Sequence, residues 1–166
     1  MIPTPLHVLF LCTHNAARSI LAEAALNAMG AGRFLAYSAG SSPRGDQQPH
    51  PLALQTLQHA GISTVGLRSK SWDEFATPDA PQMDLIITVC DNAAGEACPF
   101  WPGHPATAHW GFADPSAGDA PEAVKLEAFR HTLLLLQRRL TLLVQLPPDK
   151  LEKTLLQTSA RALAHH

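Results

Sequence analysis

The chain has 166 residues, of which 46% are hydrophobic and 16% are charged, a composition typical of one globular domain with a sizeable core. Its formal net charge of -2 provides no basic excess for binding nucleic acid or an anionic membrane. The apolar runs are too short to span a bilayer, and the N-terminus has neither the charged leader nor the cleavage site of a secretory signal. We therefore expect a cytoplasmic protein with no nucleic-acid or membrane partner.

The first half of the chain predicts two strand–helix units. Residues 6–11 form a run that is apolar except at His7, as in a central parallel strand that is covered on both faces. Residues 19–29 carry apolar side chains at helical spacing and end before Gly30. A short strand is predicted over residues 33–40, followed by a helix over residues 51–60 that begins with a proline.

The second half predicts two more strands and two more helices. The strands are expected over residues 83–89 and 107–112, and the helices over residues 122–146 and 149–164, separated by a pair of prolines. Alternating strands and helices with short connections predict an α/β fold with a mostly parallel sheet. Ligands of such sheets bind beyond the carboxyl ends of the strands, which is where Cys12, Cys90 and Asp114 fall.

The segment from Cys12 to Ser19 has the features of an oxyanion-binding loop. Backbone N–H groups between a strand end and a helix start can converge on one centre and bind an anion. In that field we expect the pKa of Cys12 to lie below the value of about 8.5 for a free cysteine. Arg18 can hold two oxygens of a tetrahedral oxyanion, and Ser19 can donate a hydrogen bond to the thiolate. The candidate oxyanion-binding residues are Thr13, His14, Asn15, Ala16, Ala17, Arg18 and Ser19.

These residues could also have structural rather than catalytic roles. Cys12 could pack as a small hydrophobic side chain, and His14 is better explained as facing solvent or bonding the backbone than as a catalytic base. Asp114 before Pro115 could supply a general acid, although an isolated Asp-Pro pair indicates only a turn.

The other two cysteines are separated by eight positions in a segment rich in small residues. The spacing of Cys90 and Cys98 does not match a zinc site, so metal binding is disfavoured. Two thiols near an activated cysteine suggest a disulfide relay, in which a thiolate displaces a leaving group from sulfur. The alternative is that both cysteines are incidental.

Four stretches, "VLFLCTHNAARS", "AYSAG", "VCDNAAGEACP" and "AHWGFADP", resemble the arsenate reductase branch of the low-molecular-weight tyrosine phosphatase superfamily. The resemblance implies a three-layer fold with a four-stranded parallel sheet flanked by helices. It implies a family domain over residues 1–147, which leaves residues 148–166 as a C-terminal helical extension.

The resemblance also implies a reaction that serves arsenic detoxification. Cys12 attacks arsenate, with the loop and Arg18 holding the oxygens and Asp114 aiding the loss of water. Cys90 then attacks the Cys12 sulfur and releases arsenite, and Cys98 resolves the disulfide. No tightly bound cofactor is implied, but an external thiol reductant is, either thioredoxin or glutaredoxin with glutathione. The residues that would correspond to a potassium site are Asn15, Glu23, Ser38 and Asp73.

Departures from the family pattern bear on both the reductant and the reaction. Cys90 and Cys98 lie one residue further apart than in thioredoxin-coupled members, which leaves the electron donor open. His14 stands where phosphatases usually have glycine, and "SAG" replaces the tyrosines that follow their Asp-Pro pair, and both favour the reductase. The alternatives are a tyrosine phosphatase that uses Cys12, Arg18 and Asp114, and a non-catalytic oxyanion- or partner-binding domain.

Overall fold

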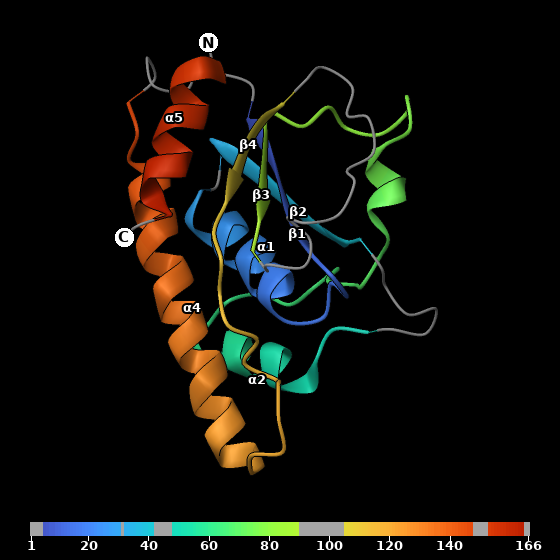
Figure 1. Ribbon diagram of the computed structural model, residues 1–166, viewed down its shortest axis with the longest axis vertical. Coiled ribbons are helices and arrows are strands. Elements are labelled where there is room, and N and C mark those ends of the chain that lie inside the picture. Colours follow the sequence, from blue (N-terminus) through green and yellow to red (C-terminus); the bar gives the residue numbers. More distant parts are fainter. Residues whose placement is uncertain (1–4, 31, 42–47, 90–104, 148–152, 165–166) are drawn as a thin grey trace.

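The centre of the protein is a parallel β-sheet. The computed structural model describes residues 5–30, 32–41, 48–89, 105–147 and 153–164. In this part of the chain four strands pair in the order β2-β1-β3-β4, all parallel (Figure 1). The strands are β1 (Leu6–Cys12), β2 (Phe34–Gly40), β3 (Leu85–Thr88) and β4 (Ala106–His109). The predicted fold class, a four-stranded parallel sheet with flanking helices, is confirmed.

Helices cover both faces of this sheet, and most of them lie on one face. Their bounds are α1 (Arg18–Met29), α2 (Pro51–His59), the short 3-10 helix η1 (Trp72–Phe75), α4 (Glu122–Val144) and α5 (Lys153–Leu163). In Figure 1, α4 and α5 stand beside the β4 edge, and η1 lies near the opposite edge. The sequence did not predict η1. Among the described residues, no helix is both long and apolar enough to cross a membrane.

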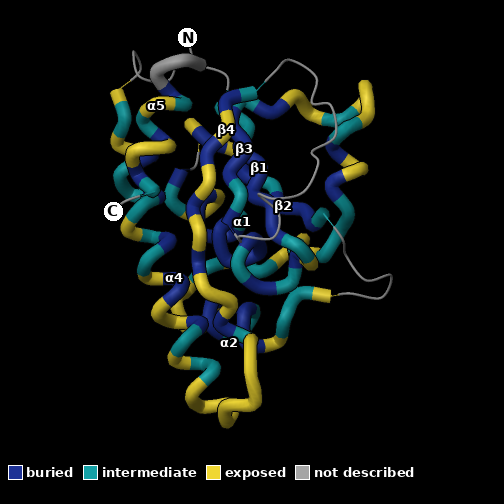
Figure 2. The backbone as a smooth tube through the Cα atoms, viewed as in Figure 1, coloured by how far each residue is buried: buried dark blue, intermediate teal, exposed yellow. Residues whose placement is uncertain are grey.

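Alternate side chains of the buried strands enter two separate cores. Val8 and Phe10 of β1 pack in the larger cluster with the long helices, whereas Leu9 and Leu11 pack in the smaller one against η1. In Figure 2 the central strands β1 and β3 are mostly buried, whereas β4 alternates between buried and exposed residues. This two-sided burial explains why β1 is apolar from Val8 to Leu11, and it places Cys12 at the carboxyl end of a rigid central strand.

Helix α5 covers the exposed edge of β4. Gln157 accepts a hydrogen bond from the Thr107 backbone N–H (3.0 Å), and Arg161 Nε donates to the Thr107 carbonyl (2.9 Å). The indole N–H of Trp110 donates to the Ala160 carbonyl (2.8 Å). An uncovered strand edge is open to pairing with other chains, so α5 both protects β4 and anchors the segment that leads to Asp114.

The last strand of the sheet ends earlier than predicted. β4 ends at His109, whereas the sequence suggested a strand to Phe112. Trp110 and Phe112 nevertheless donate backbone hydrogen bonds to the carbonyls of Thr88 and Val89, at 2.7 and 3.2 Å. The segment therefore stays attached to β3 while it turns toward the end of the sheet where Cys12 lies.

Candidate active site

Cys12 lies at the end of β1 with its sulfur surrounded by hydrogen-bond donors. The residue is 3% exposed. Its Sγ is 3.2 Å from the backbone N–H of Asn15, which donates to it, and 2.8 Å from Ser19 Oγ. A buried neutral thiol does not require donors, whereas a thiolate is stabilised by them. The arrangement is therefore suited to holding Cys12 in its nucleophilic form.

The side chain of Asn15 determines which way the Ser19 hydroxyl points. Asn15 Oδ1 accepts from the Lys70 backbone N–H (3.0 Å), which assigns the amide orientation and directs Nδ2 to Ser19 Oγ (2.7 Å). Because Ser19 Oγ already accepts this bond, its one hydrogen is available to donate to Cys12 Sγ. The predicted donation from Ser19 to the sulfur is thus consistent with the geometry.

The loop bends tightly at Asn15, which is fully buried and has a positive φ of 54°. Its backbone carbonyl accepts from Ser69 Oγ at 2.6 Å. The loop also lies directly against Gly40 of β2, where an added Cβ would come within 2.7 Å of the Thr13 carbonyl oxygen. Any other residue at position 40 would push the loop out of place, so Gly40 is required by this close approach.

Arg18, the first residue of α1, presents its guanidinium at the mouth of the loop. Its Nη1 donates to the Phe112 carbonyl (2.9 Å), and its Nη2 lies 4.0 Å from Asp114 Oδ2. The buried Nε has no hydrogen-bond partner among the residues that the structure describes. A buried donor without a partner is costly, and an oxyanion bound at the loop would satisfy it.

Asp114 is held beside Arg18 by its own turn. Ser116 donates to Asp114 Oδ1 twice, from its backbone N–H (2.9 Å) and from its hydroxyl (2.7 Å). Burial alone would raise the pKa of Asp114, but the Ser116 hydrogen bonds and the positive charges of Arg18 and His50 lower it below its ordinary value of 3.8. Without a ligand the carboxyl is therefore ionised at neutral pH.

These groups line a small cavity of about 50 Å³, the size for a small anion. Its lining comprises Cys12, His14, Ala16, Ala17, Arg18, Asp114 and Ser116. Helix α1 begins here without a capping side chain and without an acidic residue in its first turn, so no side chain of the helix competes with an anion for its first N–H groups.

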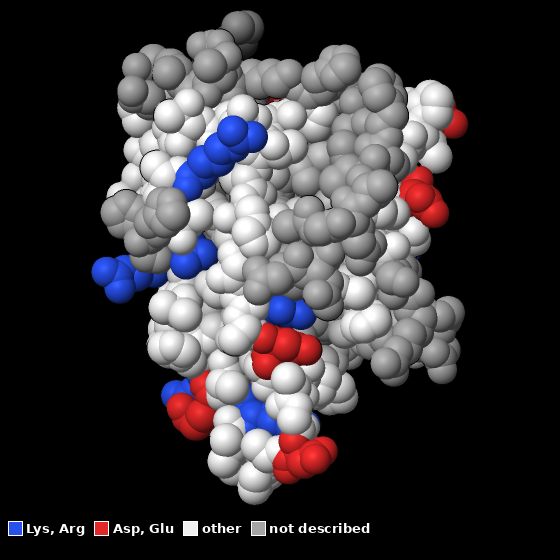
Figure 3. Space-filling view, in the orientation of Figure 1, with Lys and Arg blue, Asp and Glu red and all other residues white. Residues whose placement is uncertain are grey.

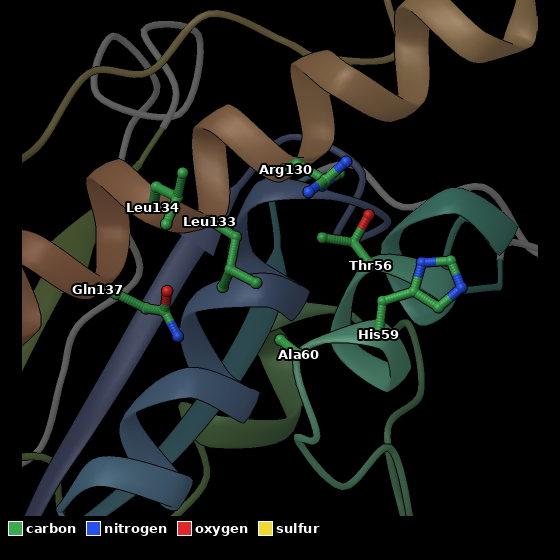
Figure 4. A pocket seen from close by; sticks show the side chains of 7 residues that line it. All are labelled: Thr56, His59, Ala60, Arg130, Leu133, Leu134 and Gln137. Carbon is green, nitrogen blue, oxygen red and sulfur yellow. The ribbon is translucent and has the colours of Figure 1, made fainter.

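A larger cavity of about 320 Å³ lies elsewhere, between α2 and α4 (Figure 4). It is lined by Thr56, His59, Ala60, Arg130, Leu133, Leu134 and Gln137. None of its lining residues belongs to the Cys12 loop. In Figure 3 the described basic and acidic side chains of the visible face are scattered in small groups rather than gathered in one basic surface.

Most of the predicted site residues come together. The loop residues 13–19 and Asp114 lie around Cys12, with Asn15 and Ser19 buried and His14 exposed, as expected for a solvent-facing histidine. Cys90 and Cys98 lie outside the described residues, so their roles stay predictions.

The residues named for a potassium site are only partly together. Ser38 Oγ donates to Glu23 Oε1 (2.5 Å), but Asp73 is exposed and its backbone N–H bonds the Ser71 hydroxyl. Lys70, which the sequence analysis did not single out, places its ammonium 3.8 Å from Glu23 Oε1. Among the described residues, no group of three or more His, Cys, Asp or Glu could hold a metal ion.

Further residues of the site escaped the sequence analysis. His50 caps α2 by accepting from the Leu52 N–H (3.1 Å), and its own backbone N–H donates to the Ala16 carbonyl (2.8 Å). The turn at Ser116 has a local signal, since an aspartate side chain commonly accepts from the backbone N–H two residues further on. The Phe112 carbonyl, Lys70 and the close approach at Gly40 depend on tertiary contacts and carry no local signal.

Comparison with known proteins agrees with this geometry. The family model described as low molecular weight phosphotyrosine protein phosphatase matches residues 7–157. A protein of Bacillus licheniformis named arsenate reductase is 34% identical over 125 residues, covering 75% of this chain and 84% of the relative.

Two solved structures extend the comparison. An arsenate reductase in the phosphate binding state aligns with a TM-score of 0.66 and 26% identity, over 84% of this chain and 96% of that one. A thioredoxin-dependent arsenate reductase of Corynebacterium glutamicum aligns with a TM-score of 0.54 and 26% identity, over 85% of this chain and 65% of that one. The fold and the cysteine loop therefore define a phosphatase-like oxyanion enzyme. The chain belongs to the low molecular weight phosphotyrosine protein phosphatase family.

Proposed function

We propose that this protein reduces arsenate to arsenite and thereby detoxifies arsenic. The observation that carries the proposal is the Cys12 sulfur, held between the Ser19 hydroxyl and the Asn15 N–H beside a guanidinium whose buried Nε lacks a described partner. Such a site activates a thiol and binds a tetrahedral anion next to it. Relatives named arsenate reductase, which are about one third identical to this chain over the aligned residues, favour arsenate over a phosphate ester as the substrate.

The first step forms a sulfur–arsenic bond. The Cys12 thiolate attacks arsenic, and one arsenate oxygen leaves as water after it gains protons. Asp114 is the proposed donor of a proton to that oxygen. Because its pKa is lowered in the free protein, the proton must come with the substrate. A bound oxyanion raises the pKa of Asp114 by adding negative charge beside it.

The second step transfers two electrons to arsenic. The Cys90 thiolate attacks the Cys12 sulfur, a disulfide forms, and the pair of the broken sulfur–arsenic bond stays on arsenic, which leaves as arsenite. Cys98 then attacks Cys90 and frees Cys12, so the oxidised protein carries a Cys90–Cys98 disulfide. This assignment of Cys90 and Cys98 rests on the resemblance alone.

An external dithiol or glutathione must return both electrons for the next cycle. Thioredoxin is the first candidate, since one structural relative is a thioredoxin-dependent arsenate reductase, and glutaredoxin with glutathione is the second. A relay that ends in a reducible disulfide operates in a reducing compartment, so the proposed location is the cytoplasm. No tightly bound cofactor takes part.

A single-turnover experiment tests the proposal. Fully reduced protein is mixed with excess arsenate and no external thiol, and arsenite and disulfides are then measured. We expect about one arsenite per chain, because one disulfide accounts for two electrons, together with a Cys90–Cys98 bridge. Cys12→Ser should give no arsenite, and Cys98→Ser should stop with Cys12 bound to Cys90. Adding thioredoxin, or glutaredoxin with glutathione, to separate samples identifies the reductant by restoring turnover.

The second candidate is a tyrosine phosphatase, which the family description and the pairing of Arg18 with Asp114 favour. A phosphatase would hydrolyse an aryl phosphate without needing Cys90 or Cys98 and would leave all three cysteines reduced. The reductase would be contradicted if arsenate gave no arsenite and left three intact thiols even with glutathione and glutaredoxin present. Hydrolysis of an aryl phosphate by the same protein would then support the phosphatase.

A further inference from the structure

Next to the Cys12 loop lies a second charged pair that does not line the oxyanion cavity. The Lys70 ammonium is 3.8 Å from Glu23 Oε1, and the two side chains are only 8% and 14% exposed. Glu23 also accepts a hydrogen bond from Ser38 Oγ (2.5 Å), and Lys70 Nζ donates to the Arg68 carbonyl (2.8 Å). A pair this secluded is costly to desolvate and requires a reason beyond surface solubility.

The segment that carries Lys70 is bonded directly to the loop. The Lys70 N–H holds Asn15 Oδ1, and the Lys70 carbonyl accepts from the Gly40 N–H (2.8 Å). Asn15 in turn donates to Ser19 Oγ, which contacts Cys12 Sγ. Displacing Lys70 would therefore disturb the amide that orients the hydroxyl at the nucleophile.

The residues that would bind potassium do not fit that ion. The Glu23 carboxylate already faces an ammonium, Asn15 Oδ1 already accepts an N–H, and Asp73 is exposed. A potassium ion between these groups would lie close to the charged Lys70 Nζ, in a poorly solvated place where like charges repel strongly.

The charge of the neighbouring Arg68 favours ionised Glu23 less than the charge of Lys70 does. Its guanidinium is paired with Glu74 through two hydrogen bonds of 2.6 and 3.0 Å on the exposed surface. Burial raises the pKa of Glu23, which the Ser38 hydrogen bond and the Lys70 charge oppose. Burial lowers the pKa of Lys70, which the Glu23 charge opposes. Each charge of the pair thus opposes the effect of burial on the other, across a separation of 3.8 Å.

We propose that the Lys70 ammonium is the permanent monovalent cation of the Asn15–Ser38–Glu23 cluster, and that it makes the Cys12 site independent of potassium. Lys70 is a positioning residue, since it acts on the nucleophile through Asn15 and Ser19. The inference rests on the proposed function only in requiring Cys12 to act as a thiolate, and it does not depend on which oxyanion is the substrate.

The test uses readouts that need no arsenate. In a Cys90→Ser/Cys98→Ser background, Cys12 is the one remaining cysteine, so the rate of iodoacetamide alkylation reports its thiolate. Rate and melting temperature are measured in potassium chloride and in choline chloride at equal concentration. The protein of this background with Lys70 and Glu23 unchanged, called the unaltered site below, should give the same rate and melting temperature in both salts.

Lys70→Met removes the charge at similar side-chain length and leaves Glu23 unpaired. We expect alkylation to be about tenfold slower in choline chloride at neutral pH, and the melting temperature to fall by about 5–10 °C. Potassium should restore part of both losses by occupying the vacated place. Lys70→Arg should lose less, and Lys125→Met, which removes the same charge from α4, should leave alkylation unchanged in either salt.

A double variant identifies the group through which potassium acts. Lys70→Met/Glu23→Gln has neither charge, and its alkylation rate should no longer depend on potassium. The proposal is overturned if the unaltered site responds to potassium over choline by about threefold or more, or if Lys70→Met matches it in rate and stability. Should Lys70→Met fail to fold in both salts, the unaltered site and the double variant still decide, because a potassium response in either contradicts the proposal. Failure of arsenate reduction would leave all these results unaffected.

Discussion

Two cation–carboxylate pairs flank the Cys12 loop, and they differ in almost every property. Arg18 and Asp114 lie at the cavity, 4.0 Å apart and 16% and 39% exposed. Lys70 and Glu23 lie outside its lining at a similar separation, but 8% and 14% exposed. Arg18 and Asp114, the cavity pair, have charges that a substrate can reach. Lys70 and Glu23, the secluded pair, have charges that face mainly each other. The first pair is suited to chemistry and the second to holding the loop in shape.

The hydrogen bonds of the two pairs support the same division. Arg18 and Asp114 are each held by a partner other than one another, the Phe112 carbonyl and Ser116 respectively. Their facing atoms thus stay available for a bound anion. Changes at the cavity should consequently alter turnover more than stability, and changes at the secluded pair should alter both. The Lys70 variants described above test the secluded pair, and the following predictions test the cavity and the loop, in order of decreasing effect.

The largest effect is expected at Arg18. Arg18→Lys keeps the charge but removes the planar fork that can hold two oxygens at once. We expect kcat/KM for arsenate to fall about 10²–10³-fold, as when a preorganised donor is removed from an oxyanion site, with little change in melting temperature. Steady-state kinetics and thermal unfolding measure both. Arg68→Lys is a matched control in the exposed Arg68–Glu74 pair and should change neither kcat/KM nor the melting temperature. If Arg18→Lys is as active as the parent protein, Arg18 does not hold the oxyanion.

Asp114 should come next. Asp114→Asn retains an oxygen that can accept the Ser116 hydrogen bonds but cannot donate a proton to a leaving oxygen. We expect kcat to fall about 10²-fold, at the lower end for loss of a general acid, without a loss of stability. Asp119→Asn, at an exposed site in the same loop, provides the comparison. If the rate of Asp114→Asn is unchanged, the proton that leaves with water comes from elsewhere.

Ser19 lies between the nucleophile and Asn15, and its hydroxyl contacts both. Ser19→Ala removes the donor to Cys12 Sγ and leaves Asn15 Nδ2 without its acceptor. A hydrogen bond to a charged group contributes about 1.5–3 kcal/mol, which corresponds to about a 10–100-fold slower alkylation of Cys12 at neutral pH. The rate profile should shift to higher pH. Thr132→Val, which removes another largely buried hydroxyl, should not shift the pH profile of Cys12 alkylation. If the profile of Ser19→Ala overlays that of the parent protein, the Ser19 hydroxyl does not stabilise the thiolate.

The parallel sheet and the cysteine loop were predictable because their signals are local. Continuous apolar runs followed by helical periodicity identify buried parallel strands, and the spacing of Cys12, Arg18 and Ser19 lies within one strand–loop–helix unit. Lys70 was missed because it is 47 positions from Glu23, so nothing near it in the chain signals a buried partner. The Phe112 carbonyl was missed for the same reason, and backbone groups carry no residue-type signal at all. Helix η1 is too short for periodicity to reveal.

The smallest expected effect belongs to His50, where the cavity and the body of the fold meet. Burial and the charge of Lys125 lower the pKa of His50, and Asp114 partly opposes them. Neutral Nδ1 caps α2 by accepting from the Leu52 N–H, which a protonated ring cannot do. The folded protein binds this proton less tightly than the unfolded chain does. The contribution of neutral His50 to stability is therefore full above the ordinary pKa of 6.5 and is lost as the pH falls through the pKa of His50 in the folded protein.

His50→Asn separates the cap from the titration. Asparagine is an effective N-cap that does not titrate in this range, so the variant should match the parent near neutral pH. It should also lose less stability than the parent when the pH falls from about 7.5 to about 5.5. His50→Ala should be less stable by about 1 kcal/mol at neutral pH, the usual effect of losing a cap. Urea unfolding at both pH values measures all three proteins.

In Asp114→Asn the carboxylate that favours protonated His50 is gone, so the pH-dependent loss of stability should begin at the same pH but be larger. Equal losses in Asp114→Asn and the parent would mean that the cavity charges do not reach the helix that supports the loop.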